Sequence, residues 1–355
     1  MEFDIVVATR NRINALQVSL PLMLGQDILP KKIIIVDSSE NHGDVKAAVK
    51  DIFAKKKINL ETLIIKSDAG ASYQRNMGLK YVSSPIVMFP DDDVLWFPEY
   101  AKNIINIYEK DKQKRVGAVT GLESLQPPEN VIEDLSSKPY EMMFIEKISK
   151  SKIGKIDNLL QRIFYPDPLL AKYEIIEKEL ASNKKKQIFG TKDESAFLTG
   201  TMKGCGMSFR SELIKELRFN ELLGRYSLFE DCDASFGILK DYFIVCAGRA
   251  KYFHFRSPEK RVDEYNWGML HVLNRSYVIC KHFPKNSIMR KMLRRYLILK
   301  TIRFIFRAQT TSGRQRFIGA WNALMLAPEI INASMHNATT KYIELKNRCL
   351  ALRKA

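Results

Sequence analysis

The chain has 355 residues, of which 46% are hydrophobic and 27% charged, so its composition is that of a globular protein and excludes disordered and fibrous classes. Its formal net charge of +17 favours a polyanionic partner: nucleic acid, an anionic membrane surface or a phosphate-rich substrate. Five widely spaced cysteines without a Cys-x-x-Cys pair argue against a disulfide framework or zinc cluster, and for a reducing compartment.

The chain opens directly into a strand-like run, without the basic and long apolar segments of a secretion signal. No stretch approaches the roughly 18 apolar residues that a membrane span requires. We therefore expect a cytoplasmic protein, attached to a membrane only at its surface.

The first 122 residues alternate short apolar runs with helical patterns. The apolar runs predict strands at 3–8, 32–36, 61–65, 85–89 and 116–122. Helical patterns lie between them at 14–23, 42–54, 72–81 and 98–109. Such alternation predicts an α/β fold with a mostly parallel, Rossmann-like sheet covered by helices on both faces. In such sheets, ligands bind beyond the carboxyl ends of the strands.

Polar residues follow three of these predicted strands, at Thr9–Asn11, Asp37–Ser39 and Asp91–Asp93. In an extended segment Asp91 and Asp93 point to one side. Two carboxylates that converge at a strand end suit Mg²⁺ or Mn²⁺, which also binds substrate phosphates and removes the repulsion between the acids. The alternative is a solvated acidic cap for the helix that starts near residue 98.

Residues 123–198 interrupt this rhythm, and we interpret them as an insertion with short helices near the site. A helix at 211–217, a loop carrying "GRYSLFEDCD" and a helix from about residue 233 follow. Two further strands are expected near 243–247 and 251–255. We expect a catalytic domain over 1–264 and a basic helical region over 265–355.

The basic charge concentrates in the C-terminal region, because residues 265–328 contain no Asp or Glu. In "MRKMLRRYLILKTIRFIFRA", Arg290 and Arg294 share a helical face, as do Lys291 and Arg295, with apolar residues alongside. This pattern is typical of a helix at an anionic membrane surface. Packing against the catalytic domain with a solvated basic face is the first alternative, and nucleic-acid binding, which we expect less, is the second.

Five segments resemble, in order and spacing, the family 2 glycosyltransferases, in particular bacterial members that build cell-surface polysaccharides. They are "VVATRNR", "IIIVDSSE", "ASYQRNMGLKYVSSPIVMFPDDDVLWFP", "KGCGMSFR" and "LFEDCDASFGI", and the resemblance covers about residues 1–257. It implies the GT-A fold, a nucleotide-diphospho sugar donor and Mg²⁺ or Mn²⁺. It also implies inverting transfer to a lipid-linked or polysaccharide acceptor at the inner face of a membrane.

The resemblance also implies roles for single residues. Asp93 and Asp91 would bind the metal, and His254 would complete that site, although a lone histidine in a strand is equally compatible with a structural role. Asp231 would be the general base, with Glu230 helping to position it. The nucleotide-binding set is Thr9, Arg10, Asp37, Arg75, Asn76, Asp91 and Asp92. The donor-sugar or acceptor set is Gly204, Cys205 and Gly206.

Two other classes of protein remain as alternatives. A nucleotidyltransferase of sugar phosphates has a similar sheet, but it usually carries a Gly-rich loop after the first strand, and "VVATRNRINA" contains no glycine. A non-catalytic basic protein that binds nucleic acid or membranes would have no use for Asp231 or for the pair Asp91 and Asp93. The segment "VDSSE" also lacks the second acid of the common "VDDGS" pattern, which affects the expected recognition of the base.

Overall fold

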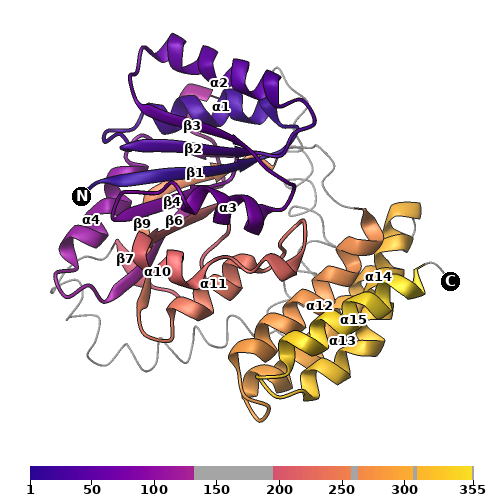
Figure 1. Cartoon of the computed structure of the whole chain (residues 1–355). Helices are drawn as coiled ribbons and strands as arrows, with labels where there is room; N and C mark the ends of the chain where they lie inside the picture. The colour runs from indigo at the N-terminus through magenta and orange to yellow at the C-terminus, as the bar shows by residue number, and fades with distance from the viewer. Residues whose placement is uncertain (132–194, 257–262, 307–309, 354–355) are drawn as a thin grey trace. The chain divides into compact units, whose positions relative to one another are not determined.

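The computed structural model describes residues 1–131, 195–256, 263–306 and 310–353 (Figure 1). They form two compact units. The sheet unit contains the described residues in 1–131, 195–221 and 234–256, and the helical unit contains those in 222–233 and from 263 onward. Most of the expected insertion at 123–198 lies outside the described residues, and the expected domain boundary at 264 stays a prediction.

The described part of the sheet unit contains one nine-stranded sheet, in the order β3-β2-β1-β4-β8-β6-β9-β5, with β7 paired to β9. The strands are β1 (Phe3–Thr9), β2 (Lys32–Asp37), β3 (Glu61–Lys66), β4 (Ile86–Pro90), β5 (Val94–Trp96), β6 (Val116–Glu123), β7 (Ala196–Leu198), β8 (Gly206–Arg210) and β9 (Phe243–His254). Strands β3, β2, β1 and β4 are parallel neighbours. Beyond them, β8 runs antiparallel to β4 and β6, and β9 runs parallel to β6.

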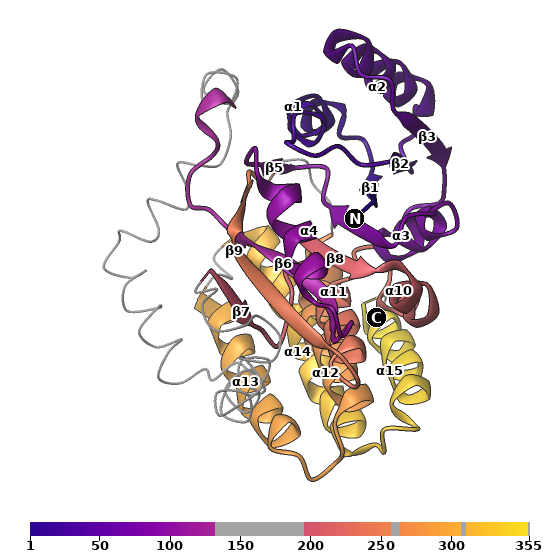
Figure 2. The ribbon, with the colours of Figure 1, turned by 90° about the vertical axis from the view of Figure 1, so that its left-hand side faces the viewer.

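Helices cover both faces of this sheet because its strands are apolar on both sides (Figure 2). Ile5 and Ile33 face a core shared with α1 (Ile13–Leu24), α2 (His42–Lys56) and α4 (Tyr100–Lys110). Their neighbours Val6 and Ile34 face a second core. That core is shared with α3 (Ala71–Leu79), α10 (Ser211–Leu217) and the end of α11 (Glu230–Ile238). The predicted α/β class is confirmed.

The structure differs from the predicted elements in four strands. The two strands expected at 243–247 and 251–255 form a single strand, β9, because the pairing with β6 shifts register between Gly121 and Leu122 and continues beyond the irregularity. Strands β5 and β7 were not predicted, since each has only three residues and pairs with the distant β9. Strand β8 was not predicted as a strand either; it pairs with β4 and β6, which lie far from it in the sequence. Two 3-10 turns are also described, η1 (Glu129–Val131) in the sheet unit and η2 (Glu221–Leu223) where the chain passes from the sheet unit to the helical unit.

The helical unit contains α12 (Glu264–His282), α13 (Ile288–Phe306), α14 (Thr311–Asn332) and α15 (Ala338–Leu352), so the predicted helical C-terminal region is confirmed. Helices α12 and α14 approach closely at two glycines. A Cβ on Gly268 would lie 1.9 Å from the Arg316 carbonyl oxygen, and one on Gly319 would lie 2.1 Å from that of Tyr265. Only glycine permits this backbone contact. Among the described helices, none is long and apolar enough to cross a membrane.

Arg290 corrects one detail of the predicted basic helix. Arg290 and Arg294 were expected to share one face of a basic amphipathic helix, but Arg290 is buried whereas Arg294 is exposed. The Arg290 guanidinium donates to carbonyl oxygens at the C-terminal ends of α12 and α14. These acceptors are Cys280 at 2.6 Å, Phe283 at 2.9 Å, Ile331 at 3.0 Å, and Ala333. Helix C-termini present unpaired carbonyls, which attract a cation.

Candidate active site

The polar residues that end the parallel strands lie side by side at one edge of the sheet. Thr9 at the end of β1 is in register with Asp37 at the end of β2. Asp91, directly after β4, forms an isolated bridge with Ala8 of β1. The structure therefore brings three segments that are separate in the sequence to the sheet edge where open α/β sheets bind ligands.

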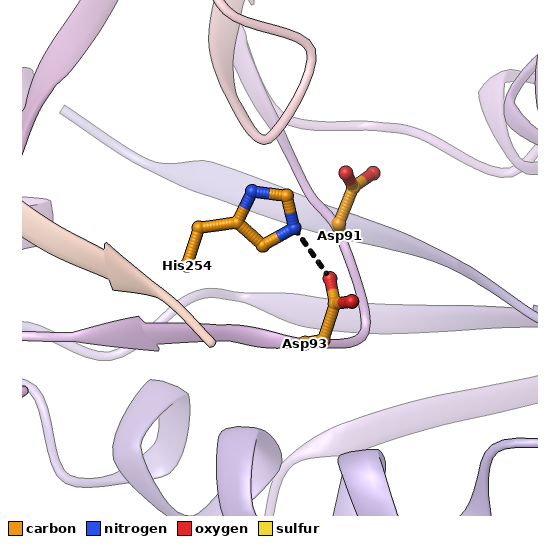
Figure 3. Close-up of side chains that lie close together, drawn as sticks. All are labelled: Asp91, Asp93 and His254. Atoms are coloured by element: carbon orange, nitrogen blue, oxygen red, sulfur yellow. Dashed lines mark hydrogen bonds and ion pairs between the residues drawn. The ribbon is translucent and has the colours of Figure 1, made fainter. Parts of the chain in front are cut away.

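Asp91, Asp93 and His254 form a cluster that could hold a metal ion (Figure 3). Each offers one ligand atom, and these atoms lie within 4.8 Å of one another. The two aspartates come from the turn between β4 and β5, and His254 ends β9, the strand that pairs with β5. Because Val94 is in register with His254, the short strand β5 sets the imidazole beside the acidic turn.

The electrostatics of the cluster agree with a cation site. His254 Nε2 lies 3.0 Å from Asp93 Oδ1. Burial alone would lower the pKa of His254, but hydrogen bonding and the negative charge of Asp93 outweigh it and raise that pKa above its ordinary value of 6.5. A field that stabilises an imidazolium also stabilises a divalent cation, and carboxylates with an imidazole are ligands that such cations accept.

A buried arginine, Arg75, contacts Asp91 of this cluster. Its Nη2 donates to Asp91 Oδ1 at 2.8 Å and to the Gly204 carbonyl oxygen at 3.4 Å. The contact links α3 to the segment before β8, which contains the predicted donor-sugar residues. Arg75 and Gly204 therefore lie together with Asp91, while their functional roles stay predictions.

Asp92 is buried and is not part of the metal cluster. Its carboxylate accepts from Thr9 Oγ1 at 2.8 Å and from Arg12 Nη1 at 2.9 Å. The same Arg12 nitrogen donates to Asp93 Oδ2 at 2.9 Å. Burial and the neighbouring charge of Asp93 raise the pKa of Asp92 to about 7, although Arg12 and Thr9 oppose the shift. Arg12 is thus the internal countercharge of the acidic turn.

Asp37 ends β2, and Arg10 directly follows the end of β1 at the same edge of the sheet. Asp37 is fully buried and accepts from the Ser39 backbone N–H at 2.8 Å, while its second oxygen lies 2.7 Å from His42 Nδ1. Arg10 Nε is buried and has no hydrogen-bond partner among the described residues. Such an orphaned donor is consistent with a polar ligand that binds here.

Three further predicted residues are already engaged in packing or in protein hydrogen bonds. The amide of Asn76 donates to the Phe219 carbonyl oxygen at 2.8 Å and to Glu221 Oε1 at 2.7 Å. Cys205 is buried, with its Sγ 3.5 Å from the Tyr252 hydroxyl. A Cβ on Gly206 would lie 2.7 Å from the same Tyr252 ring, which accounts for the glycine. Any direct ligand contact by these residues stays a prediction.

Glu230 and Asp231 begin α11 and belong to the helical unit, not to the unit that holds the acidic turn. Both side chains are partly exposed, and Asp231 Oδ1 accepts from the Cys232 backbone N–H at 2.8 Å. A carboxylate is one of the side chains that can take the proton of an attacking hydroxyl. Its role as the base stays a prediction.

Sequence reasoning missed Arg12, Gln74 and His42. Gln74 donates to the carbonyl oxygens of Thr9 at 2.9 Å and Val36 at 2.7 Å, so it joins the ends of β1 and β2. Arg12 could have been found by asking which cation neutralises three consecutive acids after a buried strand. The signal for His42 was weaker: it is the first residue of the helix that follows the strand ending at Asp37.

The fold of the chain is similar to that of solved structures of TarS from S. aureus. TarS of S. aureus, residues 1–349 in complex with UDP-GlcNAc, matches with a TM-score of 0.51 and 15% identity, over 100% of this chain and 92% of that one. The same fragment without that ligand gives 0.50 at the same identity and coverage. A mannosyltransferase from Pyrobaculum calidifontis, in complex with GDP-Man and Mn²⁺, reaches 0.48 at 14% identity, covering 99% and 75% of the two chains.

The TarS matches show a shared fold. The mannosyltransferase match has a lower TM-score, and no conclusion is based on it. Among curated protein sequences, none matches the chain significantly. The family model for glycosyl transferase family 2 matches residues 4–205. Because this match covers more than half of the chain, the protein belongs to glycosyl transferase family 2 and is a glycosyltransferase with the GT-A fold.

Proposed function

We propose that this glycosyltransferase moves a sugar from a nucleotide-diphospho sugar to a hydroxyl of a lipid-linked or polysaccharide acceptor, with inversion at the anomeric carbon. The observation that carries the proposal is the cluster of Asp91, Asp93 and His254 at the carboxyl edge of the sheet, next to buried Arg75. Family membership favours sugar transfer over the nucleotidyltransferase and binding-protein alternatives.

The residues of the cluster fit a divalent cation. Two carboxylates suit Mg²⁺ and Mn²⁺ alike, whereas the imidazole of His254 favours Mn²⁺, because Mg²⁺ prefers oxygen ligands throughout. A bound cation would act as a Lewis acid and offset the negative charge that grows on the departing diphosphate. Asp91 would bind the cation through a carboxylate that also accepts a hydrogen bond from Arg75.

Arg75 and Arg10 are suited to the diphosphate itself. A guanidinium can donate two parallel hydrogen bonds to phosphate oxygens. Arg75 is held in place by Asp91 and Gly204, and Arg10 has a buried Nε that no described residue pairs with. Thr9 and Asp37 would line the nucleotide pocket at the ends of β1 and β2. Asp37 is rigid there, because both of its oxygens have protein partners.

Asp231 would act as the general base at the acceptor. Its carboxylate would take the proton of the acceptor hydroxyl while that oxygen attacks the anomeric carbon opposite the diphosphate. The new carbon–oxygen bond forms as the bond to the diphosphate breaks and its electron pair leaves with the diphosphate. A single displacement inverts the anomeric configuration. A positioned carboxylate contributes about 10²–10⁴-fold to such a step.

We also propose that α13 holds the protein at an anionic membrane surface. Lys291, Arg295, Ile298, Ile302 and Ile305 recur at intervals of three or four residues, so they share one helical face. All five are exposed, and the three isoleucines expose 51%, 43% and 48% of their surface. A face that combines cations with exposed apolar residues suits the headgroup region of a bilayer.

Release of nucleoside diphosphate tests the enzymatic proposal. The purified chain is incubated with UDP-glucose, UDP-galactose, UDP-GlcNAc and GDP-mannose, with octyl glycosides as acceptors, in the presence of Mn²⁺, Mg²⁺ or a chelator. We expect release with at least one donor, dependent on the cation and increased by an octyl glycoside. If a chelator leaves the release unchanged, the metal site is overturned. If no donor gives release and none shows metal-dependent nucleotide binding, the function is overturned.

A further inference from the structure

The segment of residues 222–233, which we call the base loop, contains the predicted base, Asp231, close to its C-terminal end. It belongs to the helical unit, although in sequence it lies more than 30 residues before α12. Its first residue is held by α15: the Leu222 carbonyl oxygen accepts from Lys346 Nζ at 3.0 Å and lies 3.2 Å from the Tyr342 hydroxyl. The C-terminal helices therefore contact the segment from which Glu230 and Asp231 project.

One side chain of α12, Asn274, fastens both ends of the turn inside the base loop. Its Nδ2 donates to the Leu223 carbonyl oxygen at 3.0 Å and to the Leu228 carbonyl oxygen at 3.1 Å. Its Oδ1 accepts from the Tyr342 hydroxyl at 2.7 Å. Asn274 is fully buried, and an amide has two donor hydrogens, so both are used on the loop.

The turn fastened in this way has a strained backbone. Ser227 and Phe229 both have positive φ, 45° and 72°, which is uncommon for residues other than glycine and rare for a bulky one. Such conformations persist only when the surrounding structure fixes them, and they concentrate at functional sites. The Phe229 ring contacts His271 and the guanidinium of Arg275, whose Cζ lies 5.0 Å from the ring centroid. Glu230 follows directly.

The far end of the base loop is held by charge. The Asp233 carboxylate accepts from Lys281 Nζ at 2.8 and 3.0 Å and lies 2.7 Å from His282 Nε2, at the end of α12. Asp231 is two residues away from Asp233 on the same helical turn. The backbone that carries Asp231 is therefore held on both sides by α12: by Asn274 before it and by Lys281 and His282 after it.

We propose that the helical unit positions the general base, and that Asn274 is the positioning residue that fixes the base loop for catalysis. This inference rests on the proposed role of Asp231. It gives the C-terminal helices a part in the acceptor-side chemistry in addition to attachment at a membrane. Asn274 does not touch the reacting atoms; it acts through the two carbonyl groups that it holds.

Three variants test this proposal. Asn274→Leu keeps the approximate volume and removes both donors, and Tyr342→Phe removes only the hydroxyl that orients the amide. Ser276→Ala is the matched control, because Ser276 is equally buried in α12 but its hydroxyl bonds at 2.7 Å to the Val272 carbonyl oxygen of its own helix. Each variant is assayed for kcat with the active sugar nucleotide and octyl glycoside, for Mn²⁺-dependent binding of the nucleoside diphosphate, and for hydrogen exchange in residues 222–233.

We expect Asn274→Leu to lower kcat by about 100-fold, because a misplacement of about 1 Å has an effect of that size. Nucleoside diphosphate binding should be unchanged, and the base loop should exchange faster. Tyr342→Phe should have the same effects to a smaller extent, and Ser276→Ala should have none. If Asn274→Leu fails to fold, the kcat, nucleotide binding and hydrogen exchange of Tyr342→Phe test the positioning role instead. A normal kcat, or a loss of binding in parallel with kcat, overturns the positioning role.

Asp231→Asn in the same assays distinguishes a failure of the positioning role of Asn274 from a failure of the proposed glycosyltransferase function. No nucleoside diphosphate release by the unmodified chain contradicts the proposed function. An inactive Asp231→Asn together with a normal Asn274→Leu contradicts the positioning role alone. A fully active Asp231→Asn removes Asp231 as the base, and the positioning role of Asn274 fails with it.

Discussion

The acidic turn of the sheet unit and the base loop of the helical unit hold their carboxylates in different ways. Asp91 and Asp93 follow directly from the end of β4, and Arg12 and Arg75 from neighbouring elements neutralise them. Asp231 lies in a segment whose backbone is held by Asn274 and Lys281, more than 40 residues later. A strand end is defined locally, whereas the shape of a loop can be defined by distant side chains.

The largest expected effect tests the charge balance of the acidic turn. Arg12→Met leaves Asp92 and Asp93 buried without the cation that bonds to both, so we expect a loss of about 3–5 kcal/mol in the free energy of unfolding. Denaturant unfolding measures it. Adding Asp92→Asn should recover part of the loss. Lys102→Met, at an exposed cation of the same unit, is the control, and an equal loss there would contradict the account.

The matching test in the helical unit is Arg290→Met. Its guanidinium satisfies carbonyls at the ends of two helices, so its removal should lower the free energy of unfolding by about 3 kcal/mol. Arg294→Met, one turn later and exposed, should change it little. If the two variants are equally stable in thermal and denaturant unfolding, the buried arginine does not tie the helices together.

A smaller effect separates the exposed charges of α13 from those elsewhere. Lys291→Gln with Arg295→Gln should weaken binding to anionic vesicles by about 2 kcal/mol, or about 30-fold, since each cation contributes about 1 kcal/mol. The control is Lys55→Gln with Lys56→Gln, two exposed cations of the sheet unit. Sedimentation with phosphatidylserine vesicles measures both. Equal weakening by the two pairs would mean that net charge, and not the α13 face, binds the membrane.

The smallest expected effect is a pH dependence of stability in the helical unit. Burial and the nearby charges of Lys300, Arg275 and Arg316 hold the pKa of His271 well below 6.5. At His271 the unfolded chain therefore binds a proton near pH 6.5 that the folded chain does not, so the contribution of this group to stability falls as the pH drops, by about 1 kcal/mol per unit between roughly pH 6.5 and 5. Asp92, whose pKa is raised, contributes in the opposite direction over the same range. Relative to the unmodified chain, His271→Phe should therefore gain stability in thermal unfolding as the pH drops from 6.5 to 5. An unchanged pH dependence of stability would assign it to another group.

Much of the sheet unit could be predicted from sequence, because its signals are local. Apolar runs located the strands β1 to β4, and "DDD" directly after one of them indicated the acidic turn. The pairing of β5 with β9 could not be predicted, since three residues carry no usable periodicity. Arg12 was missed because its partners are some 80 residues away.

The helical unit was predictable in type but not in detail. A long basic segment with apolar periodicity predicted helices, and they are present. Periodicity placed Arg290 on the same face as Arg294, yet two helix ends draw Arg290 inward, and that geometry exists only after packing. Asn274 gave no signal at all, because a single asparagine in a helical pattern looks like any solvent-facing polar residue until the loop it holds is known.

The most direct test of the account compares Asp93→Asn with Asp231→Asn in two assays, Mn²⁺-dependent binding of the nucleoside diphosphate and transfer to the octyl glycoside. The acidic turn is proposed to hold the metal and donor, and the base loop to activate the acceptor. We predict that Asp93→Asn loses both binding and transfer, whereas Asp231→Asn binds normally and loses transfer. Normal metal-dependent binding by Asp93→Asn, or normal transfer by Asp231→Asn, would contradict this division of roles.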